Sequence, residues 1–86
     1  MKHVTIYSGP NCPYCNMAKA LLRKKGVEFE EINVELDPDA MMQVIKKTGR
    51  RTIPQIFIDD FHVGGCDDLY AYEELGKLDS LLGLDE

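Results

Sequence analysis

The residues of this sequence best suited to chemistry are two cysteines, Cys12 and Cys15, separated by a proline and a tyrosine. Thiols at this spacing can form half of a zinc site, a redox-active dithiol or two unrelated core positions. A structural zinc site needs four ligands, and Cys66, His3 and His62 are the remaining cysteine and histidine residues. Both histidines fall in predicted strands, where they are expected to be ordinary sheet residues rather than metal ligands. The cysteine pair therefore favours redox chemistry over zinc binding.

The elements around the pair explain how it could be reactive. An alternating, β-branched stretch at residues 3–7 predicts a strand, and Pro13 suits the first turn of a helix predicted over residues 13–25. Cys12 would lie at the helix N-terminus, where unpaired N–H groups and the helix dipole stabilise a thiolate. Cys15 would lie one turn further on, facing the same side. The sequence therefore predicts Cys12 as the nucleophile and Cys15 as the resolving thiol.

The helix dipole supplies only part of the stabilisation that a reactive thiolate needs. It contributes about 0.3–1 kcal/mol, and ~2 kcal/mol in a partly buried geometry. Because one pKa unit corresponds to about 1.36 kcal/mol, the dipole lowers a thiol pKa of about 8.5 by roughly one unit. Further lowering requires direct hydrogen bonds to the sulfur. Stabilising the thiolate also stabilises the reduced form, so we expect the Cys12–Cys15 disulfide to open readily and to serve catalysis.

The rest of the chain predicts one α/β domain covering residues 1–86, in the order β-α-β-α-β-β-α. Residues 27–34 alternate as a second strand, and a strand–helix–strand unit of this length requires parallel strands. Asp37 and Pro38 predict the start of a second helix that ends at Gly49. The inner side of this helix is expected to carry Met41, Met42 and Ile45.

Two further strands and a third helix follow. Residues 55–59 and 61–63 read as short strands on either side of a turn so tight that the strands must be antiparallel. Two glycines then break the chain, and a helix is predicted to begin at Asp67 and Asp68.

Composition and charge narrow the class of protein. The 86 residues are 44% hydrophobic, enough for one modest core, and the formal net charge of −5 argues against a general nucleic-acid binder. Basic side chains gather in residues 2–25 and 46–51. Three cysteines cannot all pair with one another, which argues against the disulfide framework of a small secreted protein. Since the sequence shows neither a signal peptide nor a run of about 18 apolar residues, the expected location is the reducing cytoplasm.

Three motifs together resemble the glutaredoxin family. They are Cys-Pro-Tyr-Cys at 12–15, Thr-Ile-Pro at 52–54 and Gly-Gly-Cys-Asp-Asp at 64–68, and their order and spacing cover essentially the whole chain. The resemblance is greatest to the small bacterial dithiol glutaredoxins of the glutaredoxin-3 type. It implies a thioredoxin fold, in which a four-stranded mixed sheet is flanked by three helices, and glutathione as co-substrate.

The resemblance also implies a glutathione site. The Ile53–Pro54 peptide bond would be cis, presenting the Ile53 main chain to a substrate. The N–H groups of Cys66 and Asp67 would hold the γ-glutamyl carboxylate and the Asp67 side chain the ammonium, unless this aspartate merely caps the helix. Many members carry a lysine three residues before the first cysteine, where this chain has Gly9. The predicted glutathione-binding residues are Tyr14, Arg51, Thr52, Ile53, Pro54, Gly65, Cys66 and Asp67, with Arg51 meeting the glycine carboxylate.

The activity that the resemblance implies is reduction of protein–glutathione mixed disulfides and of protein disulfides by a monomer without bound metal or organic cofactor. Reducing equivalents would come from NADPH through glutathione reductase. One alternative is a redoxin reduced by thioredoxin reductase, against which the motif at 64–68 argues. Another is a carrier module, with a [2Fe–2S] cluster bridging two chains through Cys12 and glutathione, against which Pro13 argues. Cys66 is expected to be a small side chain at a helix start, with regulatory glutathionylation or intermolecular pairing as the alternative.

Overall fold

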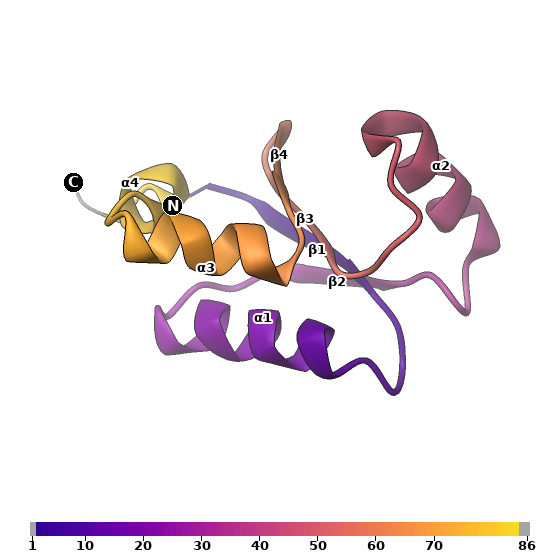
Figure 1. Ribbon diagram of the computed structural model, residues 1–86, viewed down its shortest axis with the longest axis horizontal. Coiled ribbons are helices and arrows are strands. Elements are labelled where there is room, and N and C mark those ends of the chain that lie inside the picture. Colours follow the sequence, from indigo (N-terminus) through magenta and orange to yellow (C-terminus); the bar gives the residue numbers. More distant parts are fainter. Residues whose placement is uncertain (1, 85–86) are drawn as a thin grey trace.

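The structure is a computed structural model that describes residues 2–84, which form four strands and four helices (Figure 1). In chain order these are β1 (Val4–Ser8), α1 (Pro13–Lys24), β2 (Glu30–Asn33), α2 (Pro38–Thr48), β3 (Gln55–Ile58), β4 (Phe61–Gly64), α3 (Cys66–Glu74) and α4 (Leu78–Leu82). The predicted order of the first seven elements is confirmed. Within the described residues, no helix is long and apolar enough to cross a membrane.

Helix α4 is missing from the sequence prediction, which ends with the third helix. It has five residues, and no side chain caps its first turn. So short a helix shows hardly more than one turn of apolar periodicity, which does not distinguish it from an apolar loop. Leu78 and Leu82, four residues apart, are both fully buried and close one end of the core.

The strands lie in the order β2-β1-β3-β4, with β1 parallel to β2, β1 antiparallel to β3, and β3 antiparallel to β4. Both predicted pairings are confirmed. The second strand is shorter than predicted, because Val27 still closes the end of α1 by donating its N–H to the carbonyl of Leu22. Tyr7 pairs with Gln55, so the chain leaves β1 where it enters β3. The loop that carries the cysteines therefore lies beside the loop that precedes β3.

Side chains alternate between two cores on opposite faces of the sheet. Val4 and Ile6 of β1 pack in one cluster with residues of α1, α3 and α4, whereas Tyr7 packs with residues of α2. Figure 1 shows α1 and α2 on opposite sides of the strands. This layering leaves the N-termini of α1 and α3 on the same side of the sheet.

The predicted inner face of α2 is wrong. Its buried residues are Ala40 and Val44, while Met42 is 62% exposed and Met41 and Ile45 are only partly buried. Ala40 and Val44 join a cluster that contains two aromatic rings of the sheet. A small side chain at position 40 lets the helix approach those rings closely, so the longer methionine side chains lie at the edge of the contact.

Lys25 fixes the far end of α1 against α3 and α4. Its Nζ lies 2.6 Å from the Oδ1 of Asp79 and 2.7 Å from the Oε1 of Glu73. The hydrogen bonds to Asp79 and then to Glu73 raise the pKa of Lys25 above its usual range. These ion pairs hold the C-terminal ends of α1 and α3 together, and so help to set how their N-terminal ends meet.

Candidate active site

The cysteine pair lies at the beginning of α1. Cys12 is the N-cap, with an extended backbone at φ −119° and ψ 96°, and Pro13 occupies the first helical position. The Sγ of Cys12 accepts the backbone N–H of Cys15 at 3.1 Å. Asn11, just before, has φ 54°, a left-handed conformation that asparagine adopts more readily than most residues. The Cys12 sulfur thus lies at the helix N-terminus, as the sequence predicts.

Cys12 and Cys15 form a disulfide, with their Cα atoms 5.2 Å apart. In the reduced protein, the Cys12 sulfur would take the same place as a thiolate, so the N–H of Cys15 would be a direct donor to its charge. The first turn of α1 contains no acidic side chain that would oppose that charge. Cys12 is half-buried and Cys15 fully buried. Of the two sulfurs, that of Cys12 is the one within reach of a large substrate.

The loop before β3 forms the second side of the site. The Ile53–Pro54 peptide bond is cis, as the resemblance implied, and the Ile53 carbonyl oxygen lies 4.0 Å from the Cys12 Sγ. A Cβ at Gly9 would lie 2.9 Å from the Cδ1 of Ile53. The Ile53 side chain therefore occupies the space next to Gly9, the position at which many glutaredoxins carry a lysine.

The N-terminus of α3 forms the third side. Gly65 is the N-cap, and its N–H donates to the Oδ2 of Asp68 at 2.9 Å. Asp68 is therefore the capping aspartate, which leaves the exposed Asp67 side chain available. Within residues 2–84, the N–H groups of Cys66 and Asp67 donate to no acceptor of the chain. Two backbone donors at a helix N-terminus suit a carboxylate ligand.

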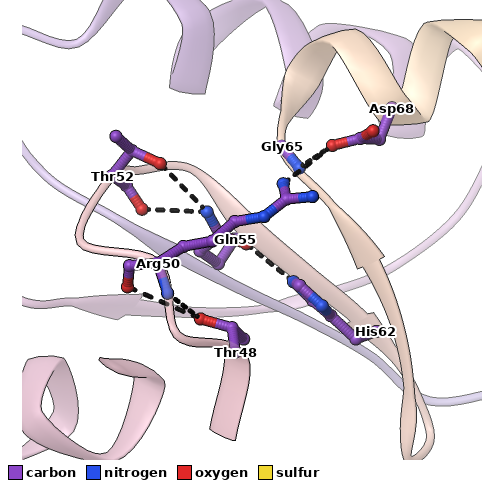
Figure 2. Close-up of polar contacts among 7 residues, drawn as sticks. All are labelled: Thr48, Arg50, Thr52, Gln55, His62, Gly65 and Asp68. Carbon is purple, nitrogen blue, oxygen red and sulfur yellow. Dashed lines mark hydrogen bonds and ion pairs between the residues drawn. The ribbon is translucent and has the colours of Figure 1, made fainter. Parts of the chain in front are cut away.

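Arg50 connects the loop before β3 to α3. Its Nη1 lies 3.0 Å from the Oδ2 of Asp68 (Figure 2), and its backbone N–H donates to the Oγ1 of Thr48 at 3.0 Å, at the end of α2. The hydrogen bond from Arg50, and then that from the Gly65 N–H, hold the pKa of Asp68 below its usual range. Asp68 therefore stays ionised at neutral pH and bridges two walls of the site.

These three sides enclose a cavity of about 190 Å³. Its lining residues are Tyr14, Arg50, Thr52, Ile53, Pro54, Gly65, Cys66, Asp67 and Asp68. The predicted glutathione-binding residues all line it except Arg51, which is exposed elsewhere on the loop. Sequence reasoning missed Arg50 as a lining residue. The only signal was the pair of neighbouring arginines, which does not say which of them points inward.

Cys66 lies at the start of α3 and lines the cavity, but it is only 4% exposed. Its burial, and then the charge of Asp67, raise the pKa of the Cys66 thiol above its usual range. Cys66 is a free cysteine, and at neutral pH it is therefore a protonated, weakly reactive thiol. Within the described residues, no three His, Cys, Asp or Glu side chains gather as a metal site.

Alkylation by iodoacetamide is expected to distinguish Cys12 from Cys66 in the reduced protein. If the Cys15 N–H and the helix N-terminus stabilise the Cys12 thiolate, its alkylation should persist below about pH 7. Cys66 should react only at alkaline pH, because its pKa is raised and it is buried. Mass spectrometry of the alkylated peptides as a function of pH provides the measurement, with the denatured protein as control. A Cys12 midpoint near the ordinary thiol value of about 8.5 would contradict the expected stabilisation.

The comparisons with known proteins all point to the same family. Residues 4–63 match the Glutaredoxin family model. Glutaredoxin 3 of Escherichia coli strain K12 is 52% identical over 82 residues, which cover 95% of this chain and 99% of that protein. The solution structure of a glutaredoxin from Brucella melitensis is 55% identical, with a TM-score of 0.86 over 100% of this chain and 94% of the other. The crystal structure of a buckwheat glutaredoxin–glutathione complex is 30% identical, with a TM-score of 0.87 over 93% and 76% of the two chains.

Proposed function

The chain belongs to the glutaredoxin family of glutathione-dependent thiol–disulfide oxidoreductases, and we propose that the cavity beside Cys12 binds the glutathionyl half of its substrates. The observation that carries this proposal is the continuity of the site. The cavity lies between Ile53, whose carbonyl oxygen is 4.0 Å from the Cys12 sulfur, and the free N–H groups that begin α3. The buckwheat glutaredoxin, whose structure contains glutathione, supports the same use of the cavity here.

The chemistry we propose is thiol–disulfide exchange in two steps. The Cys12 thiolate attacks the glutathionyl sulfur of a protein–glutathione disulfide; the bond between the two substrate sulfurs breaks, and the protein thiolate leaves and takes a proton from solvent. The thiolate of a second glutathione attacks the glutathionyl sulfur on Cys12, which releases glutathione disulfide and restores the Cys12 thiolate. With a protein disulfide as substrate, the Cys12 thiolate attacks one substrate sulfur, and the other leaves as a thiolate. The Cys15 thiolate then attacks Cys12 in this mixed disulfide; the bond between Cys12 and the substrate sulfur breaks, and the second protein thiolate leaves. Two glutathiones reduce the resulting Cys12–Cys15 bond and leave as glutathione disulfide.

Each charged group of glutathione has a proposed partner in the cavity. The N–H groups of Cys66 and Asp67 would hold the γ-glutamyl carboxylate, and the Asp67 carboxylate would hold the ammonium. Tyr14, which is 59% exposed, would cover the tripeptide from the α1 side. Thr52 and the Ile53 main chain would pair with its backbone. For the glycine carboxylate the cavity offers Arg50, while the resemblance to the family points to Arg51.

Replacing each arginine by alanine is expected to show which one binds the carboxylate. Arg50→Ala should raise the Michaelis constant for glutathione a few-fold, because an exposed ion pair is worth about 0.2–1 kcal/mol. The maximal rate should change less, since the contact is remote from the reacting sulfurs. Arg51→Ala removes the same charge from the neighbouring position and is the matched control. Steady-state kinetics at low and high ionic strength provide the measurement, and the Arg50 effect should shrink at high salt. A larger effect of Arg51→Ala would assign the contact to Arg51 instead.

We further propose that the protein acts as a monomer in the cytoplasm and is kept reduced by NADPH through glutathione reductase and glutathione. The decisive assay combines the protein with glutathione, glutathione reductase, NADPH and a glutathionylated peptide. NADPH should be consumed at a rate that depends on the protein and on glutathione. Failure in this assay, together with reduction of the Cys12–Cys15 disulfide by thioredoxin reductase, would identify the protein as a redoxin that thioredoxin reductase, rather than glutathione, keeps reduced.

A further inference from the structure

A buried amide lies directly behind the cavity wall. Gln55, the first residue of β3, is fully buried, and its Nε2 donates to the Thr52 carbonyl oxygen at 3.0 Å and lies 3.2 Å from the Thr52 Oγ1. Its Oε1 lies 2.7 Å from the Nε2 of His62 on β4. Figure 2 shows the row of side chains from Thr52 through Gln55 to His62. A fully buried amide is costly unless its polar atoms are paired, and here both are.

The row has only one possible arrangement of donors. The Thr52 carbonyl can only accept, so the amide nitrogen of Gln55 must face it. The amide oxygen then faces His62, which must donate from Nε2. Burial, and then the charge of Arg50, lower the pKa of His62, so at neutral pH the ring is uncharged and has a single N–H. Its place at Nε2 is thereby fixed.

The Gln55 amide supplies a hydrogen bond to Thr52 that the main chain does not make. Within residues 2–84, no backbone N–H donates to the Thr52 carbonyl, and Pro54 has no N–H to offer. The side-chain amide instead spans the turn from inside and holds the Thr52 carbonyl. Thr52 and Ile53 both line the cavity, and the Ile53 carbonyl faces the Cys12 sulfur.

His62 holds the amide in place and is itself held by packing. Its ring lies against that of Phe57, with centroids 5.0 Å apart and an angle of 30° between the planes. Phe57 belongs to the buried cluster beneath α2. The row thus connects the cavity wall to the buried cluster on the α2 side of the sheet.

We propose that Gln55 and His62 are positioning residues for glutathione: they hold Thr52 and the Ile53 main chain in the geometry that binds the tripeptide beside Cys12. This inference rests on the proposed function, since it assumes that glutathione occupies the cavity. Neither side chain lines the cavity, so both act through Thr52.

Kinetics of His62→Phe provide the main test, because phenylalanine keeps the ring against Phe57 and removes only the donor. A lost hydrogen bond is worth about 0.5–1.5 kcal/mol, so the Michaelis constant for a glutathionylated peptide should rise by roughly 2- to 10-fold. The maximal rate and the alkylation rate of Cys12 should stay near those of the unmodified protein, since the Cys15 N–H still serves the sulfur. His62→Gln, which restores an N–H donor, should recover part of the loss. His3→Phe is the matched control, because His3 is exposed and pairs with Glu30 rather than with the site.

A second measurement does not depend on glutathione: nitrogen-15 NMR of the His62 ring at neutral pH should show the proton on Nε2. In the kinetic assay, Gln55→Met should raise the Michaelis constant for the glutathionylated peptide in the same way as His62→Phe. A proton on Nδ1, an unchanged Michaelis constant in His62→Phe, or an equal rise in His3→Phe would overturn the positioning role. If the unmodified protein fails to reduce the glutathionylated peptide, the proposed function itself is overturned, whereas normal turnover with an unchanged Michaelis constant in His62→Phe overturns the positioning role alone.

Discussion

Cys12→Ser is expected to abolish the reduction of glutathionylated substrates, with a loss of at least about 1000-fold, because the attacking sulfur is removed. Cys15→Ser should keep a substantial fraction of this activity. The donor to the Cys12 sulfur is the backbone N–H of residue 15, which serine retains, and the glutathionylated substrate needs no second thiol. The measurement is the steady-state rate with a glutathionylated peptide, coupled to glutathione reductase.

Two controls accompany this comparison. Cys66→Ser removes the remaining thiol, and its rate should stay close to that of the unmodified protein because Cys66 is a buried thiol with a raised pKa. Reduction of a protein disulfide should require both Cys12 and Cys15, since the second thiol resolves the mixed disulfide. Equal losses from Cys12→Ser and Cys15→Ser with the glutathionylated peptide would contradict the division of roles.

Gly64→Ala is expected to destabilise the fold and the cavity together. Gly64 has φ +116°, and a Cβ there would lie 2.6 Å from the Cγ and 2.9 Å from the Cβ of Asp68. The backbone strain costs about 1–2 kcal/mol, and displacing the capping carboxylate costs ~1 kcal/mol more. The free energy of unfolding should fall by about 2–3 kcal/mol, which corresponds to a melting temperature lower by roughly 10–20 °C. The Michaelis constant for glutathione should rise as well.

Gly26→Ala is the matched control for this substitution. Gly26 also has a positive φ, +74°, but a Cβ there would meet no atom within 4 Å. It should therefore show the backbone strain of about 1–2 kcal/mol without a change in the Michaelis constant. Thermal unfolding and glutathione kinetics on both variants separate strain from displacement of Asp68. Equal destabilisation by the two, with unchanged glutathione kinetics, would show that Asp68 is not needed to form the cavity.

Much of the fold follows from local signals. The alternation in β1, the proline at the start of α1 and the tight turn between β3 and β4 each act within a few residues, and they predict the element order. The inner face of α2 depends instead on distant rings. Ala40 and Met42 both suit a helix, and packing against the aromatic rings of β1 and β3 decides which is buried.

The site likewise has some features that nearby residues determine and others that distant contacts determine. The position of Cys12 at the start of α1 is of the first kind, because it follows from the spacing of the two thiols and Pro13. The choice between Arg50 and Arg51 is not local, since it depends on Asp68, which lies 18 residues further along the chain. The row from Thr52 to His62 is equally invisible in the sequence, because Gln55 at the start of a strand gives no sign that its amide spans the preceding turn.

The closing of the core by α4 also brings distant parts of the chain together. The N–H of Lys2 donates to the carbonyl of Leu82 at 3.2 Å, and Figure 1 shows this region at the opposite end of the molecule from the start of α1. The polypeptide therefore enters and leaves the fold at nearly one point, well away from the reacting sulfur. We expect that the fold can therefore be fused at either end to another protein, or inserted into one of its surface loops, with the Cys12 sulfur still open to substrates.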